Sequence, residues 1–256
     1  MSIHANCPGP GESLLVDYRY SVSVQEILVG LRQEGSLENL LWLLEHPPTI
    51  TLGTSGGSDH LLLPVEDLEA GGVAVVQTPR GGDITCHEPG QLVGYPVVDL
   101  DDTPCRRDIH RYLRALEDGI IGVLGRLGLE GVRIEERTGV WIAGSAPRKI
   151  AAMGVRCNRW ITSHGFALNF RNDLRGFGAI VPCGISDAGV TSLQQELPAD
   201  RLPSHEELRA LVHEELQRCL GLPLRLAVGG GIAELHRALR EERVFESSLS
   251  EPRGLE

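Results

Sequence analysis

Lysine is almost absent from this chain. Of its 24 basic side chains one is lysine, at position 149, and the others are arginine. A phosphate-binding loop of the form G-x-x-x-x-G-K-[ST] needs a lysine directly after a glycine, and Lys149 follows Arg148, so this kind of nucleotide site is excluded. No G-x-G-x-x-G turn follows a predicted strand either, which removes the usual signature of dinucleotide binding.

Long apolar runs and paired-cysteine motifs are missing as well. No stretch of about 18 uncharged apolar residues occurs, so we expect no membrane-spanning helix. The first residues lack the basic and apolar segments of a secretory signal. The six cysteines are scattered and form no C-x-x-C pair, which is typical of reduced thiols rather than of a disulfide framework. We therefore expect a cytoplasmic protein.

Basic residues are also outnumbered by acidic ones, and the formal net charge is −11 at pH 7. A protein that binds nucleic acid normally presents a basic face to the phosphates. We therefore expect neither a nucleic acid nor a membrane as a partner.

The patterns that are present mix helices and strands without strict alternation, which predicts a single α/β (α+β) domain. Helices are expected over 22–33, 64–70, 108–127 and 204–220, and strands on both sides of Pro47-Pro48 and over 73–77, 91–100, 150–155 and 160–170. The clearest helix is 108–127, whose apolar residues recur at about 3.6-residue spacing on one face. The last helix begins at Ser204, where Glu207 completes an S-x-x-E capping box.

The two ends of the chain differ from its centre. We expect an N-terminal arm over 1–13, the domain over 14–226, and a charged tail over 227–256. Because the tail begins near three consecutive glycines at 229–231, we expect it to be dispensable and partly mobile.

Reactive and turn-forming residues concentrate in three segments, the first of which is "RGGDITCHEPGQLVGYP" over 80–96. The turn at Gly81 and Gly82 would let the backbone approach a ligand closely and offer N–H groups to an oxygen. In an extended strand Thr85 and His87 would project to the same side.

The second segment, "RKIAAMGVR" over 148–156, contains the lysine. An isolated lysine is most often a solvated surface charge. In a chain so rich in arginine, however, a retained lysine indicates a need for a compact ammonium or for an amine that can lose its proton, which arginine does not do. Ala152 and Gly154 would leave space beside it.

The third segment, "IVPCGISDAGVTSL" over 180–193, presents Cys183 between a proline and a glycine. A turn of this kind exposes a side chain on a fixed backbone, so Cys183 is the best candidate nucleophile among the cysteines, although most cysteines are inert core residues. A free thiol is only a few per cent thiolate at pH 7, and a neighbouring cation such as Lys149 would raise that fraction.

Together these segments resemble the octanoyltransferases of lipoate biosynthesis, in "RGGDITCHEPGQ", "YP", "RKIAAMGVR", "HGFALN" and "PCGI" with "GVTSL", and in the earlier "LLEHPPTITLG". The resemblance covers about residues 14–221. It implies a mixed sheet flanked by helices, as in the biotin and lipoate protein ligases. It also implies Cys183 as the nucleophile and Lys149 as its partner. The residues that it implies for the acyl site are Arg80, Gly81, Gly82, Asp83, Ile84, Thr85, Cys86, His87, Ala152, Met153, Gly154, Gly165, Phe166 and Ala167.

The resemblance further implies the partners and the chemistry. The donor would be octanoyl-acyl carrier protein, and the acceptors would be lipoyl domains of 2-oxoacid dehydrogenase E2 subunits and the glycine cleavage H protein, with no cofactor and no metal. The chain departs from the family at Glu88, where a glycine is usual, and at Cys86, where an aromatic residue is more frequent. These departures bear on loop shape and packing rather than on the expected chemistry.

Three alternatives remain open from the sequence. An ATP-dependent lipoate-protein ligase would share the fold and the acceptor without needing Cys183. A zinc site could combine Cys86, His87, His164 and Cys183, although the first two are adjacent and would point to opposite faces of a strand. A non-catalytic module that binds lipoyl domains is the third.

Overall fold

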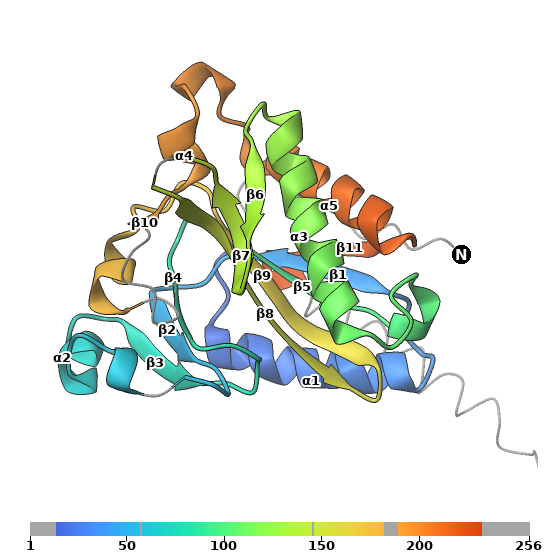
Figure 1. Ribbon diagram of the computed structural model, residues 1–256. Helices are drawn as coiled ribbons and strands as arrows, with labels where there is room; N and C mark the ends of the chain where they lie inside the picture. The colour runs from blue at the N-terminus through green and yellow to red at the C-terminus, as the bar shows by residue number, and fades with distance from the viewer. Residues whose placement is uncertain (1–13, 57, 145, 182–188, 232–256) are drawn as a thin grey trace, which may run out of the picture.

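The computed structural model describes residues 14–56, 58–144, 146–181 and 189–231. A mixed sheet forms the centre of the molecule (Figure 1). In spatial order its strands are β11 (Arg225–Val228), β1 (Leu40–Leu44), β5 (Gln91–Val97), β9 (Ile161–Asn169), β8 (Arg148–Asn158), β7 (Arg137–Ile142) and β6 (Gly131–Ile134), and β10 (Gly189–Val190) also pairs with β8. β11 runs parallel to β1 and β10 parallel to β8, whereas the other neighbours are antiparallel.

A smaller sheet lies beside the central one. It consists of β3 (Ala74–Gln77), β2 (Thr49–Leu52) and β4 (Ile84–His87), with β2 in the middle. The short helix α2 (Val65–Ala70) contributes Leu68 to its apolar cluster, which includes Ile50 and Phe177. The mixed sheets confirm the predicted α/β class.

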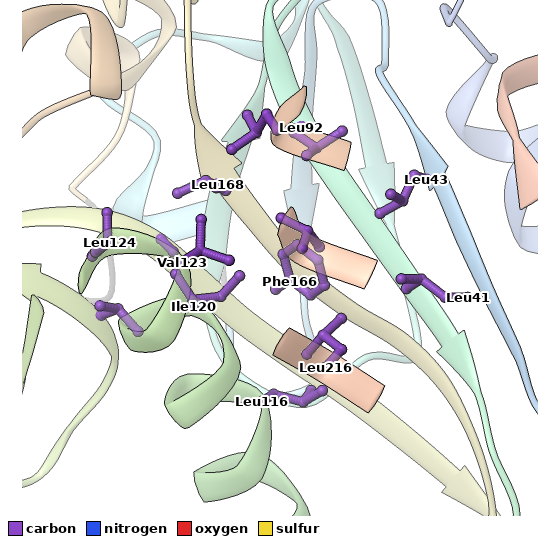
Figure 2. Packing of buried hydrophobic residues seen from close by; sticks show 14 of the residues in the cluster. Leu41, Leu43, Leu92, Leu116, Ile120, Val123, Leu124, Phe166, Leu168 and Leu216 are labelled. Carbon is purple, nitrogen blue, oxygen red and sulfur yellow. The ribbon is translucent and has the colours of Figure 1, made fainter. Parts of the chain in front are cut away.

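Helices cover both faces of the central sheet. α3 (Ile109–Arg126) and α5 (His205–Leu220) pack on one face together with the short α4 (Leu193–Glu196), and α1 (Tyr18–Gln33) packs on the other. Figure 2 shows how α3 and α5 meet the strands through Leu116, Ile120, Val123, Leu124 and Leu216 on the helices and Leu41, Leu43, Leu92, Phe166 and Leu168 on the sheet. In the part of the chain that the structure describes, no helix combines the length and the apolar character that crossing a membrane requires.

The helix ends follow local chemistry. The Asp108 side chain accepts hydrogen bonds from the N–H groups of His110 and Arg111, which fixes the start of α3. At α5, Ser204 and Glu207 form both hydrogen bonds of the predicted capping box, and Gly221 ends the helix in the left-handed region with φ of 66°. Both helices confirm the sequence prediction to within one residue at each end.

Three features differ from the prediction. α1 begins four residues before 22, because Asp17 caps it by accepting a hydrogen bond from Tyr20 N–H. The β6–β7 hairpin was not predicted; β6 has only four residues, all partly or fully exposed, and its apolar alternation is limited to Val132 and Ile134. β11 continues to Val228, and Trp42 Nε1 donates to Gly229 O at 2.9 Å. The predicted boundary at 226 therefore falls inside a strand, while 1–13 and 232–256 lie outside the described residues.

A buried carboxylate ties α3 to the β6–β7 hairpin. Glu117 on α3 is fully buried, and its Oε2 accepts from Arg114 Nη1 at 2.6 Å and from Arg133 Nε at 2.7 Å. Its Oε1 accepts from Gly139 N–H at 2.9 Å. The charge is thus compensated, and the same carboxylate holds the backbone of β7.

Replacing this carboxylate should destabilise the fold. We expect Glu117→Gln to lower the free energy of unfolding by about 2 kcal/mol, because charge-assisted hydrogen bonds are lost in a buried setting. Asp118→Asn is the matched control: Asp118 also pairs with Arg133, at 2.7 Å, but is 53% exposed, so its loss should cost no more than about 0.5 kcal/mol. Urea denaturation measures both, and equal effects would contradict the role of Glu117.

Candidate active site

A cavity of about 330 Å³ lies between the central sheet and the smaller sheet. This volume is in the range of pockets that bind small molecules. Its walls come from α1, β4, β5, β7, β8, β9 and the loops before β4. The lining residues are Tyr18, Ser55, Arg80, Gly82, Asp83, Ile84, Thr85, His87, Val93, Tyr95, Glu136, Arg137, Thr138, Lys149, Ala152, Met153, Gly154, His164, Gly165, Phe166 and Ala167.

Most of the residues expected at an acyl site contribute to this lining. Thr85 and His87, expected on one side of a strand, both face the cavity. Two residues do not line it. Gly81 lies behind Gly82, and its N–H donates to Val155 O at 2.8 Å. Cys86 turns away into the apolar cluster of the smaller sheet, and burial raises the pKa of its thiol.

Lys149 lies in the wall of the cavity. Its side chain belongs to β8 and is buried, with 7% of the residue surface exposed. Nζ lies 4.8 Å from the centre of the Trp141 ring, directly over its face. The Lys149 carbonyl accepts a hydrogen bond from Thr191 N–H at 3.0 Å, so the strand itself is fixed beside β10. The lysine is therefore no solvated surface charge.

Cys183 lies outside the described residues, but the chain on either side of it is placed. Val181 N–H donates to His60 O at 2.9 Å, and His60 Nδ1 lies 2.6 Å from Asp83 Oδ2 at the cavity. On the other side, Val190 pairs with Lys149. Both neighbouring parts of the chain thus run next to cavity residues.

A neutral histidine, His46, lies behind the cavity wall against the rings of Tyr95 and His87, which line the cavity. His46 Nδ1 donates to Val16 O at 2.6 Å, because a carbonyl can only accept. Its Nε2 then accepts the hydroxyl proton of Tyr95, also at 2.6 Å. Burial lowers the pKa of His46 to about 4, which agrees with this neutral tautomer, and burial raises the pKa of Tyr95.

His87 is held in one tautomer in a similar way. The Gln91 side chain donates through Nε2 to Cys86 O and to Asn169 Oδ1, which leaves its Oε1 to accept from His87 Nδ1 at 2.8 Å. Burial lowers the pKa of His87 well below 6.5. The ring is therefore neutral at pH 7, with its Nε2 lone pair available in the cavity.

His164 is strained as well as buried. Its φ of 55° lies in the left-handed region, and its N–H donates to Gln25 Oε1 at 2.6 Å. Its Nδ1 has no hydrogen-bond partner within the described chain. The pKa of His164 is lowered to about 3, first by burial and then by the charges of Arg80 and Arg156.

Arg80 brings a fixed positive charge to the cavity. It is 7% exposed, and its Nη2 donates to both Thr51 O and Thr51 Oγ1 at 2.8 Å. Nη1 donates to Gly81 O at 3.2 Å and so braces the glycine turn. An arginine buried among these acceptors stays charged and holds the loop before β4 in place.

The sequence did not point to the rest of the lining. Tyr18 is a buried aromatic residue that no motif distinguishes, Tyr95 belongs to the "YP" motif but was not expected at the acyl site, and 136–138 belong to the unexpected hairpin. Asp17, a good helix cap before Tyr18, is the one signal that would have extended α1 to the cavity.

The two departures from the family pattern have structural partners. Glu88 Oε1 accepts from Gly176 N–H and Oε2 from Asn172 Nδ2, which joins the β4–β5 turn to the segment after β9. A Cβ at Gly176 would meet Cys86 Sγ at 2.4 Å, so the two positions share one tightly packed region. As for the zinc alternative, the described residues contain no group of three metal-ligating side chains, and Cys183 lies outside them.

Comparison with known proteins places the chain in a family. The sequence model of the lipoyl protein ligase A/B catalytic domain matches residues 17–217. An octanoyltransferase of Solibacter usitatus (strain Ellin6076) is 50% identical over 178 residues, which is 70% of this chain and 78% of that protein. An octanoyltransferase of Flavobacterium johnsoniae is 51% identical over 170 residues, 66% of this chain and 72% of that protein.

Solved structures agree on the fold. Lipoate-protein ligase A bound with ATP matches with a TM-score of 0.65 and 17% identity over 91% of this chain and 95% of that chain. A structure from an archaeal lipoylation system, a bi-partite lipoate protein ligase and its E2 lipoyl domain from Thermoplasma acidophilum, has a TM-score of 0.65 and 16% identity over 90% and 91%. The chain therefore belongs to the lipoyl protein ligase A/B catalytic domain family, and within it to the octanoyltransferases.

Proposed function

We propose that this acyltransferase takes an octanoyl group from octanoyl-acyl carrier protein and transfers it to a lysine of a lipoyl domain, through a thioester on Cys183. The lipoyl domains would be those of 2-oxoacid dehydrogenase E2 subunits and of the glycine cleavage H protein. The observation that carries the proposal is the position of Lys149, whose amine lies in the wall of the cavity that the expected acyl-site residues line.

The anchors around Cys183 support its role as the nucleophile. Val181, two residues before Cys183 in the sequence, donates its N–H to His60 O at 2.9 Å, and the His60 ring lies 2.6 Å from the cavity residue Asp83. Two residues of extended chain span at most about 7 Å. After Cys183, the chain returns to pair with Lys149 at Val190. A thiol in this segment can therefore reach the cavity edge.

In the first step the Cys183 thiolate attacks the thioester carbonyl of the donor. A carbon–sulfur bond forms to the enzyme, the bond to the carrier sulfur breaks, and the carrier leaves as a thiolate that takes a proton from water. The Lys149 ammonium favours this step because a nearby positive charge stabilises the attacking thiolate. Exchange of one thioester for another needs no nucleotide.

In the second step the acceptor amine attacks the enzyme thioester and becomes an amide. Once Cys183 is acylated its negative charge is gone, so the attraction between that sulfur and the ammonium is lost and Lys149 can release its proton to water. A neutral Lys149 can then accept the proton that the incoming amine loses, and Cys183 leaves as the thiolate. An arginine can fulfil the first role but not the second, since it remains charged.

The neutral histidines suit the cavity to an apolar acyl chain. His46, His87 and His164 all have pKa values below the usual range because they are buried. Charged rings here would require solvation that an octanoyl chain cannot provide. Ala152, Gly154 and Gly165 leave space in the wall that β8 and β9 form.

An octanoyl adduct on the enzyme tests the nucleophile. After incubation with octanoyl-acyl carrier protein without nucleotide, intact-mass spectrometry should show one octanoyl group on the wild-type chain and none on Cys183→Ser. Cys86→Ser is the control and should still be acylated, because Cys86 faces away from the cavity. An adduct that persists on Cys183→Ser would assign the nucleophile elsewhere, and transfer that requires ATP would favour a ligase.

Lys149→Arg tests the change of role between the two steps. The variant should keep the positive charge and still form octanoyl-enzyme, while transfer to a lipoyl domain falls by about 10²- to 10⁴-fold, the usual contribution of a general base. Arg156→Lys, exposed on the same strand, should transfer normally. Single-turnover measurements separate the steps, and wild-type transfer by Lys149→Arg would contradict the base role.

The buried histidines also make stability depend on pH. Between about pH 6.5 and pH 4 the unfolded chain protonates these rings and the folded chain does not, so the unfolded state binds more protons and stability falls as pH falls. Each buried histidine should change the free energy of unfolding by up to about 1.4 kcal/mol for each pH unit in this range. We expect His164→Asn, which tolerates the left-handed backbone, to reduce this slope in urea unfolding at pH 5, 6 and 7.

The control for this series is His110→Asn. His110 is exposed at the start of α3. The free energy of unfolding of His110→Asn should therefore change with pH as steeply as that of the wild-type chain. If His164→Asn had the same slope as the wild type, the neutral state of His164 would be contradicted.

A further inference from the structure

Trp141 and Lys149 are paired across two neighbouring strands. They are directly opposite each other in the register of β7 and β8, and the ammonium lies 4.8 Å from the ring centre. Trp141 is 1% exposed. A cation over an indole face is attracted by the ring, and the attraction is stronger when water is excluded.

A bulge creates this pairing. Val140 pairs with Ala151, yet the next residue of β7, Trp141, pairs with Lys149 rather than with Ile150. The extra residue on β8 shifts the register, and directly opposite residues of an antiparallel pair project on the same side. Without the bulge Trp141 would lie opposite Ile150. The irregularity therefore brings the indole and the amine together.

The backbone before Trp141 is shaped around the lysine as well. Gly139 has φ of 121°, and a Cβ there would lie 3.5 Å from Lys149 Cε and 2.6 Å from Ala151 O. Its N–H is held by Glu117 Oε1, from a carboxylate that is fully buried and bound by Arg114 and Arg133. α3 thus fixes the position of β7 two residues from the indole.

We propose that Trp141 is a positioning residue for Lys149: its indole face holds the ammonium at the cavity wall and favours the protonated amine when Cys183 carries the acyl group. The inference rests on the function proposed above, in which that amine must lose its proton before it can act as a base. The ring then sets the pH at which transfer to the acceptor becomes fast.

Removing the ring should make the amine easier to deprotonate. A cation–π contact of this kind changes a protonation equilibrium by about 2- to 30-fold, which moves a pH midpoint by about 0.3 to 1.5 units. In Trp141→Leu the midpoint of transfer should therefore move to lower pH by that amount. In Trp141→Phe, whose ring attracts a cation less than indole does, the midpoint should lie between Leu and wild type.

The experiment follows transfer from octanoyl-enzyme to a lipoyl domain in a single turnover between pH 5.5 and pH 9. Octanoyl-enzyme is first prepared from octanoyl-acyl carrier protein and verified by mass. Trp42→Phe is the matched control, because Trp42 is a fully buried tryptophan on β1 whose indole contacts Tyr95 and Gly229, whereas Lys149 lies over the ring of Trp141. It should retain the wild-type midpoint.

The outcomes separate the inference from the proposed function. The positioning role is supported if the midpoint moves to lower pH in Trp141→Phe and moves further in Trp141→Leu. A rate that falls at every pH with an unchanged midpoint would show that Trp141 acts only through packing and would overturn the inference, while the proposed function would stand. If wild-type chain formed no octanoyl-enzyme, the proposed function would fail, and this inference with it.

Discussion

The antiparallel pairing of β8 with β9 is the constraint on which both the sheet and the cavity depend. Its register sets Ala152 opposite Ala167 and Gly154 opposite Gly165, so small residues meet at these two positions of the cavity wall. A Cβ at Gly165 would lie 2.3 Å from the Gly94 carbonyl oxygen. The space for a ligand therefore depends on close approach of backbones, which larger side chains would prevent.

Strand β8 also fixes the position of the Lys149 amine. Lys149 is the second residue of β8 and lies between β7 on one side and β10 on the other, so a sheet rather than a loop carries it. Groups on rigid elements hold a productive geometry more closely than groups on loops. Burial beside Trp141 also limits the number of side-chain conformations available to it. The rigid strand thus provides the fixed position that the proposed role of Lys149 in two successive steps requires.

Local signals in the sequence were sufficient for much of the fold. The extents of α3 and α5, the capping box of α5, the two strands around 150–170 and the family itself were predicted, because each leaves a short-range pattern. The β6–β7 hairpin was not, because β6 is only four residues long and the alternation of Val132, Arg133 and Ile134 is too short to stand out. The ring cluster of His46, Tyr95 and His87 also depends on contacts between distant strands, which no spacing in the chain reveals. The predicted lining was thus incomplete, and the roles of Lys149 and Cys183 remain predictions.

The central claim is that the amine of Lys149 acts on the sulfur of Cys183. The most direct test is the pH dependence of Cys183 alkylation by iodoacetamide, followed by peptide mass spectrometry in the wild-type chain and in Lys149→Met. The account predicts that the wild-type midpoint lies below about 8.5, the value for a free thiol, and that the midpoint rises when the amine is removed. Identical midpoints in the two proteins would contradict it.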